Sequence, residues 1–233
     1  MAIPCFYLPE LECDGVRVDL PETESAHALQ SRRLKSGARI NLINGRGLTG
    51  QAEIIKTTKR LVTVQVESVT SHVRSEPGLT IAVAMPKGDR QKVMVDMLTQ
   101  LGVTTIIPLV SRYSVTNVKE AQIKKLQRLV IEACKQSQNP WFTEIAHPSS
   151  IAAVLDQAAA AYYANQGGDS ISEYKNIEGP VTVLIGPEGG FSESEVDEFE
   201  KNEIASISVG QHILRTETAA IALASVFMSN DDG

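Results

Sequence analysis

The part of the chain after residue 78 alternates strand-like with helix-like segments, and this constrains the fold more than any other feature. Short runs rich in Val, Ile and Leu predict strands, whereas longer segments with apolar residues at helical spacing predict helices. Such alternation is typical of a mainly parallel sheet covered by helices. The predicted strands are 79–84, 105–108, 142–146, 161–164, 181–185 and 204–209; the predicted helices are 89–101, 119–137, 151–160, 192–201 and 216–228; a polar loop is predicted at 165–179.

The N-terminal part has a different pattern. Residues 38–70 alternate apolar and polar side chains at the period of a strand, and Asn44-Gly45 is a dipeptide typical of hairpin turns. A helix is predicted before these strands, at 24–34. Several short strands joined by tight turns favour a small β-barrel. We therefore expect two domains, a β-barrel at 1–72 and an α/β domain at 73–233.

Charge is distributed unevenly along the 233 residues, although the net charge is −6. Residues 30–66 hold eight Lys and Arg against one acid, and residues 74–140 hold ten against five. Residues 141–233 hold three bases against fifteen acids. A phosphate backbone is therefore expected to meet the N-terminal two-thirds, although the same charges are equally compatible with a solvated surface.

Several classes of protein are disfavoured by composition. No apolar run approaches the roughly 18 residues of a membrane helix. The first ten residues lack the basic start and apolar core of a signal peptide, so a cytoplasmic location is expected. The three cysteines, Cys5, Cys13 and Cys134, show no C-x-x-C spacing, so we expect neither a disulfide framework nor a metal site.

The GPEGG segment, residues 186–190, lies between predicted strand 181–185 and predicted helix 192–201. Ligands bind beyond the carboxyl ends of parallel strands, and glycines there allow the backbone to approach closely. The helix opens Ser192-Glu193-Ser194-Glu195, a capping box whose carboxylates would repel phosphate. A neutral or cationic ligand fits better. Taken alone, the segment is also compatible with a turn that only joins strand to helix.

A second polar segment, residues 208–218, follows the next predicted strand at the same sheet edge. It precedes a helix that is apolar almost all round, so this helix is expected to be buried in the domain or against a partner subunit. Arg215 and Glu217 are then charges at the start of a buried helix, which is costly unless they pair or serve a site. One alternative is a mutual Arg215–Glu217 ion pair that only caps the helix.

These segments and others, in this order, resemble the RsmE-type 16S ribosomal RNA uridine-N3 methyltransferases of the SPOUT superfamily. The resemblance runs through nearly the whole chain; each matching piece is weak alone and their order is specific. The chain departs from the family pattern at Gln138-Asn139 and at His212, which concerns RNA contacts more than cofactor binding. The matching pieces are 27–29, 32–37, 84–90, 100–103, 106–109, 132–137, 184–192 and 213–222.

The resemblance implies a fold and a cofactor that residue patterns do not supply. The implied fold is an N-terminal PUA-like β-barrel followed by a SPOUT α/β domain, with a trefoil knot and the cofactor site at about 160–230. The implied cofactor is S-adenosylmethionine, and the implied assembly is a homodimer with the terminal helix at its interface. The residues expected to hold the cofactor are Ile185, Gly186, Pro187, Glu188, Gly189, Gly190, Val209, Gly210, Ile213 and Leu214.

The implied reaction is methyl transfer to uridine N3 in 16S ribosomal RNA of the small subunit, in its decoding region. Uracil N3 must lose a proton, and an ordinary Glu, with a pKa of about 4.3, is a poor base for it. Arg215 is therefore expected to stabilise the developing uracil anion, with Glu217 orienting Arg215 or the base. Residues expected to contact RNA phosphates are Arg32, Arg33, Lys35, Arg39, Arg46, Lys87 and Arg90.

Two rival functions remain open at this stage. A related SPOUT enzyme acting on transfer RNA would keep the cofactor site and change only the RNA. A non-catalytic ribosome-assembly protein would bind RNA with its barrel and use the knot as a dimer scaffold. The GPEGG segment and residues 213–218 count against the second rival.

Overall fold

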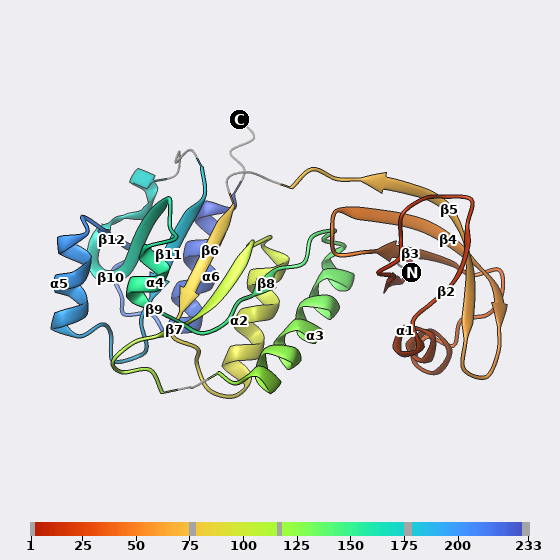
Figure 1. Cartoon of the computed structure of the whole chain (residues 1–233), viewed down its shortest axis with the longest axis horizontal. Helices are drawn as coiled ribbons and strands as arrows, with labels where there is room; N and C mark the ends of the chain where they lie inside the picture. The colour runs from red at the N-terminus through yellow and green to blue at the C-terminus, as the bar shows by residue number, and fades with distance from the viewer. Residues whose placement is uncertain (1–2, 75–77, 116–117, 175–178, 230–233) are drawn as a thin grey trace. The chain divides into compact units, whose positions relative to one another are not determined.

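The computed structural model describes residues 3–74, 78–115, 118–174 and 179–229. These residues form two compact units (Figure 1). The first unit comprises the described residues up to Arg74 together with the segment Ile131–Phe142. The second comprises the described residues of 78–130 and 143–229.

The first unit is built on a five-stranded sheet with the order β1-β3-β4-β5-β2. The hairpin predicted at Asn44 is confirmed. The side-chain oxygen of Asn44 accepts hydrogen bonds from the backbone N–H groups of Arg46 and Leu48, at 2.8 and 3.0 Å. β1 and β3 are parallel, and the other neighbours are antiparallel. The strands are β1 (Cys5–Tyr7), β2 (Arg17–Asp19), β3 (Arg39–Ile43), β4 (Leu48–Thr57) and β5 (Val62–Ser71).

The core of this unit lies on one face of the sheet, as the alternating pattern predicts. Leu42, Ile54 and Val64 are fully buried there. They pack in one cluster with Phe6 of β1 and with Ala28, which lies just after the short helix Glu22–Ala26. The side chains between these positions point to the opposite face of the sheet, so that face is available for other contacts.

The helix predicted at 24–34 is wrong in its length. The structure has a short helix, α1 (Glu22–Ala26), followed by one π-helical turn, η1 (His27–Ser31). Arg33 adopts a left-handed φ of 52°. The N–H of Leu34 then donates to the carbonyl of Ala28 at 3.0 Å, which closes the end of the helix. The turn allows Leu29 and Leu34 to pack against the core, and this burial outweighs continued helical propensity.

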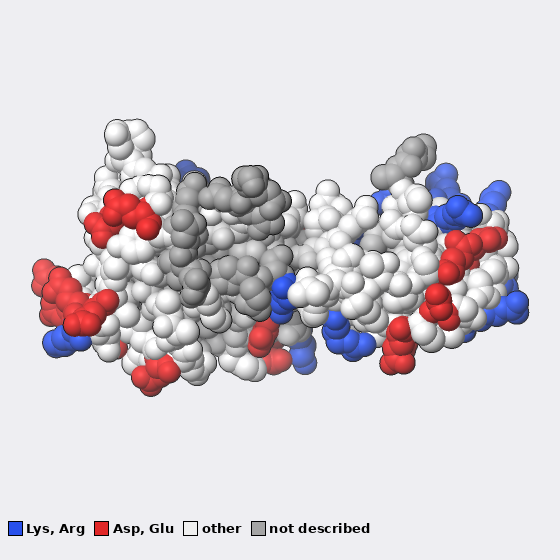
Figure 2. Space-filling view, turned by 90° about the horizontal axis from the view of Figure 1, so that it is seen from above, with Lys and Arg blue, Asp and Glu red and all other residues white. Residues whose placement is uncertain are grey.

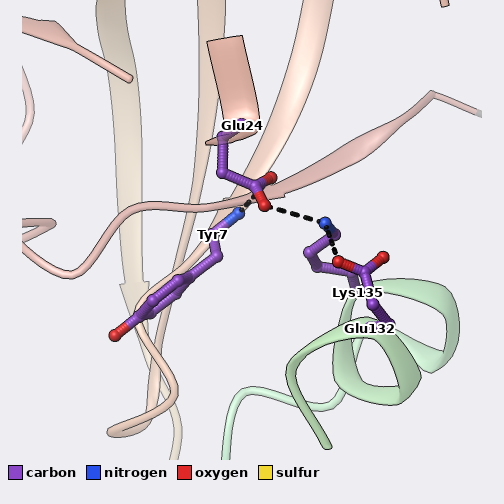
Figure 3. Close-up of polar contacts among 4 residues, drawn as sticks. All are labelled: Tyr7, Glu24, Glu132 and Lys135. Atoms are coloured by element: carbon purple, nitrogen blue, oxygen red, sulfur yellow. Dashed lines mark hydrogen bonds and ion pairs between the residues drawn. The ribbon is translucent and has the colours of Figure 1, made fainter. Parts of the chain in front are cut away.

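A buried ion pair joins the segment 131–142 to the sheet of the first unit (Figure 3). Lys135 Nζ lies 2.9 Å from Glu24 Oε1 and 2.7 Å from Glu132 Oε1. The other oxygen of Glu24 accepts the backbone N–H of Tyr7, at 3.2 Å. The side chains of Lys135 and Glu24 are 5% and 7% exposed. Lys135 therefore connects the helix α3 (Glu120–Ser137) to strand β1 through Glu24.

The second unit is built on a parallel sheet with the order β12-β10-β11-β6-β7-β8, and β9 pairs with β7. The alternation of strands and helices predicted this architecture. The strands are β6 (Leu79–Val83), β7 (Thr105–Val110), β8 (Glu144–Ile145), β9 (Ser149–Ser150), β10 (Ala160–Ser170), β11 (Val181–Ile185) and β12 (Ala205–Ser208).

Helices cover this sheet through two sets of contacts. Helices α4 (Ile151–Leu155) and α5 (Glu193–Lys201) contribute Ile151 and Phe199 to one cluster with Leu184 of β11. Helix α6 (Thr216–Phe227) packs against α2 (Asp89–Gln100) and against β6 and β11. Strand β11 is buried along its whole length, as expected for a central parallel strand.

Two predictions for the second unit are wrong. The polar loop predicted at 165–179 begins as a strand, because β10 continues to Ser170 and is followed by a 3₁₀ turn, η2 (Ile171–Tyr174). Its pairing with β12 resumes at Asp169 after an irregularity, so hydrogen bonding overrides the polar composition. Helix α4 ends at Leu155, five residues before the predicted end. The knot stays a prediction.

No helix in the described part of the chain is both long and apolar enough to cross a membrane.

Candidate cofactor and active site

A cavity of about 290 Å³ lies at the carboxyl ends of β11 and β12 and beside the middle of β10. Every residue that the sequence predicts to hold a cofactor lines it: Ile185, Gly186, Pro187, Glu188, Gly189, Gly190, Val209, Gly210, Ile213 and Leu214. The two predicted loops come together because β11 and β12, which flank β10, run parallel and end at the same edge of the sheet. The cavity is therefore assembled from the GPEGG segment and the loop before α6.

Two glycines of the GPEGG segment are favoured for different reasons, Gly186 by close packing and Gly190 by its backbone conformation. A Cβ at Gly186 would lie 3.3 Å from the backbone of Gly190 and from the ring of Phe191. Gly190 has a φ of 74°, a backbone conformation that residues other than glycine rarely adopt. The segment therefore folds tightly over the end of β11, and its backbone faces the cavity.

Thr216 ties the start of α6 to the GPEGG segment. The Thr216 hydroxyl donates to the carbonyl oxygen of Gly186 at 3.2 Å, and Thr216 is buried. In contrast, Ile213 is 80% exposed in the loop just before the helix. The loop therefore presents apolar surface beside the cavity, while Thr216 anchors the end of the loop.

The carboxylate of Glu188 pairs with Arg90 at the N-terminal end of α2. Arg90 Nη1 lies 2.8 Å from Glu188 Oε1 and 3.8 Å from Glu217 Oε2. The pKa of Glu188 lies below the usual range, mainly because its carboxylate accepts a hydrogen bond from its own backbone N–H. Burial raises this pKa, but the positive charges of Arg90 and Lys87 lower it further. Glu188 therefore stays ionised at neutral pH.

Glu217 is buried, and its Oε2 atom has no hydrogen-bond partner among the described residues. Arg215 is exposed and forms no ion pair with any residue that the structure describes. The alternative of a mutual Arg215–Glu217 pair is therefore wrong. The two side chains diverge because residues two apart lie on different sides of a helix, which directs Glu217 toward Arg90 of α2 and leaves Arg215, the N-cap, in solvent.

The N-terminus of α5 confirms the predicted capping box. The backbone N–H of Ser192 donates to Glu195 Oε2 at 2.7 Å, and the box is complete. The other Glu195 oxygen accepts the backbone N–H of Arg112, also at 2.7 Å. This carboxylate occupies the positive end of the helix dipole, so a phosphate is disfavoured there.

The lining of the cavity fits an S-adenosylmethionine cofactor. Among the described lining residues there is no Lys or Arg, and Glu188 is the one carboxylate. Val209, Leu214 and Ile185 supply apolar walls, and the glycines supply backbone donors and acceptors. A ligand with apolar parts and net positive charge is compatible with this set. The residues described include no group of His, Cys, Asp and Glu able to hold a metal ion.

Further lining residues come from positions that sequence reasoning missed. Ala164 lies at the end of the predicted strand 161–164, Asn165 and Gln166 lie in β10 where a loop was predicted, and Thr216 and Leu223 come from α6. The parallel order of β10 and β11 brings the first group to the cavity. No local motif marks Asn165 or Gln166, whereas Thr216 could have been found from its position inside the 213–222 match.

The residues predicted to contact RNA phosphates belong to both units. Arg32, Arg33, Lys35 and Arg39 are exposed around the end of η1 and the start of β3 in the first unit. Arg46 is exposed, but its Nη2 atom donates to the carbonyl of Pro9 at 2.7 Å. Figure 2 shows basic side chains over the first unit, interspersed with acidic ones, and acidic side chains gathered at the end that carries α5. In the second unit Lys87 is exposed, whereas Arg90 is paired with Glu188.

Comparison with known proteins relates both units to RNA methyltransferases. A family model for an RNA methyltransferase domain matches residues 74–228, and a model for an RNA methyltransferase PUA domain matches residues 20–67. The chain belongs to this RNA methyltransferase family. The first unit is PUA-like, and the second is the methyltransferase domain. The predicted fold class is confirmed in both parts, apart from the untested knot.

Relatives extend over most of the chain. It is 30% identical to ribosomal RNA small subunit methyltransferase E of Rickettsia conorii, over 94% of this chain and 93% of the relative. It is 26% identical to the Bacillus subtilis protein of the same name, over 85% and 84%. The structure of the Neisseria gonorrhoeae protein of that name, bound to S-adenosylmethionine, matches with a TM-score of 0.89, 26% identity and 96% coverage of both chains. A Legionella pneumophila structure with bound S-adenosylmethionine matches with a TM-score of 0.90, 26% identity and 97% coverage of both chains.

Proposed function

We propose that this chain transfers a methyl group from S-adenosylmethionine to N3 of a uridine in 16S ribosomal RNA. The observation that carries the proposal is one cavity at the end of β11, which is lined by all the residues predicted to hold the cofactor. Relatives named for methylation of small-subunit ribosomal RNA, and two solved with S-adenosylmethionine, support it. The enzyme is an S-adenosylmethionine-dependent rRNA methyltransferase. The identity of the methylated atom, N3 of a uridine, is the more specific part of the proposal.

The protein's contribution to the reaction is mainly positioning. When bound, S-adenosylmethionine supplies a methyl group attached to a positively charged sulfur. Backbone groups of 186–190 and 209–214 would hold its adenosine and methionine parts against the apolar walls. The ionised Glu188 favours a cationic ligand in the cavity. Burial and orientation of this kind account for a large part of catalysis in group transfer.

Arg215 is the proposed catalytic residue. Loss of the N3 proton leaves negative charge on the uracil ring, and a guanidinium beside a ring oxygen stabilises that charge. Arg215 is exposed next to the cavity and forms no internal ion pair among the described residues, so its charge is available to substrate. Glu217 is proposed to act through Arg90, which it approaches at 3.8 Å, and thereby on the position of the GPEGG segment.

The exposed bases around η1 and β3 are proposed to bind RNA phosphates, together with Lys87. Each such contact releases counterions, so binding should weaken as salt rises. An rRNA substrate also fits a cytoplasmic location. A homodimer is proposed through α6, whose Ile221, Val226 and Phe227 are half-buried within one chain.

Mass mapping of methylated nucleotides in ribosomal RNA tests the proposed substrate. Cells that lack this protein should lose one methylated uridine in 16S rRNA, and the purified chain with S-adenosylmethionine should restore it on their small subunits. Transfer RNA from the same cells serves as the competing substrate. Loss of a mark in transfer RNA alone would contradict the proposal.

Arg215→Ala tests the proposed catalytic role, with cofactor affinity measured separately by calorimetry. Turnover should fall by about 10²-fold or more, as for the loss of an oxyanion-stabilising group, while cofactor affinity changes little. Lys201→Ala, at the exposed end of α5, is the matched control for removal of a surface cation. Unchanged turnover in Arg215→Ala would remove this residue from the mechanism.

A further inference from the structure

A row of polar side chains crosses four strands of the PUA-like sheet, on the face opposite its core. Cys5 of β1 is in register with Asn41 of β3, Asn41 with Gln51 of β4, and Gln51 with Ser68 of β5. Their neighbours along each strand, such as Leu42 and Ala52, point into the core. The row is therefore the outer face of the sheet, and none of its members contributes to the hydrophobic core.

This row borders a cavity of about 240 Å³ within the first unit. A second row, two residues further along the strands, adds Thr49 and Thr70, which are also in register. The His72 ring lies at the cavity with its Nε2 atom 2.8 Å from the hydroxyl of Thr49. The register shift between Gln51 and Ala52 leaves Glu67 of β5 without a partner, which marks a bulge in β5 beside the cavity, and bulges often redirect side chains at binding sites.

Gln138 completes the lining from outside the sheet. It follows the last residue of α3 and adopts a left-handed φ of 58°, a conformation that costs free energy for any residue except glycine. Strain of this kind is tolerated where the surroundings hold the backbone. Here the buried Lys135–Glu24 ion pair anchors the end of α3 near strand β1 (Figure 3). Gln138, three residues after Lys135, is thereby held at the cavity.

The lining has a uniform chemistry. It includes no Lys, Arg, Asp or Glu, but it offers three carboxamides, three hydroxyls, an imidazole and a thiol. Burial raises the pKa of Cys5 to about 12, so this thiol is neutral at physiological pH. No cation is present here to offset the charge of a phosphate, whereas carboxamides and hydroxyls match the mixed donors and acceptors on the edge of a base.

We propose that this cavity binds an unstacked base of the RNA through its hydrogen-bonding edge. The proposal rests on the proposed function in one respect, namely that the partner is RNA. It assigns base recognition to the neutral outer face of the PUA-like sheet and phosphate contacts to the separate basic residues around η1. The base bound here is distinct from the base methylated at the other domain's cavity.

Gln138→Gly separates recognition from folding. Glycine removes the amide and relieves the left-handed strain, so thermal stability should be unchanged or higher. Loss of one or two hydrogen bonds to a base should weaken RNA binding by about 5- to 20-fold. Gln65→Ala, a β5 carboxamide that bonds Arg17 and does not line the cavity, is the matched control.

The probes are single-stranded oligoribonucleotides and the same oligomers with abasic residues, measured by fluorescence anisotropy. The wild-type chain should prefer oligomers with bases, and Gln138→Gly should lose that preference while it binds abasic oligomers as before. The double variant Arg32→Ala, Arg33→Ala should weaken binding to both probes equally, since it removes phosphate contacts.

Equal losses on both probes in Gln138→Gly, or no loss at all, would overturn the proposal. A change in oligomeric state on size exclusion, with RNA binding unaltered, would also overturn it, because the face would then bind a second copy. Methylation mapping reports on the proposed function independently. Base-dependent binding that is lost in Gln138→Gly supports the cavity even if the methylated uridine is not found.

Discussion

Arg90 and Glu188 form an ion pair of 2.8 Å between the N-terminal end of α2 and the GPEGG segment. These residues are 98 positions apart in the chain. The contact gives Arg90 an internal partner that the sequence, which indicated an RNA contact for this residue, did not predict, and Glu217 Oε2 lies 3.8 Å from the same nitrogen. One guanidinium therefore connects α2, the cofactor cavity and the first turn of α6.

Arg90→Gln should weaken S-adenosylmethionine binding by up to about 5-fold. Both side chains of the pair are 40% exposed, and such pairs contribute about 1 kcal/mol at most. Calorimetry of the purified variant measures the effect. Lys92→Gln is the matched control, since Lys92 pairs with Asp89 on the same helix away from the cavity. Equal affinities in wild type and Arg90→Gln would exclude a role for the pair in shaping the cavity.

Lys135→Met should lower the free energy of unfolding by about 3–5 kcal/mol, because it leaves the buried Glu24 carboxylate without its cation. The double variant Lys135→Met, Glu24→Gln should recover part of this loss, since no buried charge remains. Urea unfolding measures both. A double variant no more stable than the single one would show that packing, rather than charge, holds the segment 131–142.

Alkaline pH should weaken the same contact. Burial works to lower the pKa of Lys135, but its bonds to Glu132 and Glu24 outweigh this and raise the pKa above 10.5. A raised pKa means that the folded state binds the proton more tightly than the unfolded state. The stabilisation is complete below pH 10.5 and is lost as pH rises through the folded pKa. Unfolding midpoints from pH 9 to 12 should converge for wild type and Lys135→Met.

Thiol labelling should distinguish Cys13 from Cys5. The thiolate is the reactive form, and burial raises the pKa of Cys5 to about 12. Cys13 is exposed. At pH 7.5 iodoacetamide should therefore modify Cys13 in the native protein while Cys5 reacts only after denaturation, as read by peptide mass spectrometry. Comparable native rates at both positions would contradict the neutral state of the half-buried Cys5 thiol.

Gly47→Ala should destabilise the PUA-like unit more than Gly15→Ala. Both glycines have positive φ, 94° and 73°, so both substitutions carry backbone strain of about 1 kcal/mol. A Cβ at Gly47 would also collide with the indole of Trp141, whereas Gly15 faces open space. Overpacking of this kind costs a further 1–3 kcal/mol or so. Thermal unfolding compares the two; equal losses would show that Trp141 moves freely.

Local patterns were sufficient for much of this protein. The alternation after residue 78 predicted the parallel sheet, and the Asn44 turn predicted the hairpin of β3 and β4, because both depend on the order of side chains along a short segment. The capping box at Ser192 is likewise local. Even the meeting of the two cofactor loops followed from local signals, since parallel strands end at a common edge.

Other features depend on residues that are distant in the chain. Arg90 meets Glu188, Lys135 meets Glu24, and the polar row from Cys5 to Ser68 spans four strands, each through strand order or helix packing. The wrong predictions have the same origin. Tertiary packing shortened the helix predicted at 24–34, and pairing with β12 extended β10 into the segment predicted as a polar loop. Sequence spacing specifies the period of each element, whereas burial and pairing between elements select the partner of each side chain.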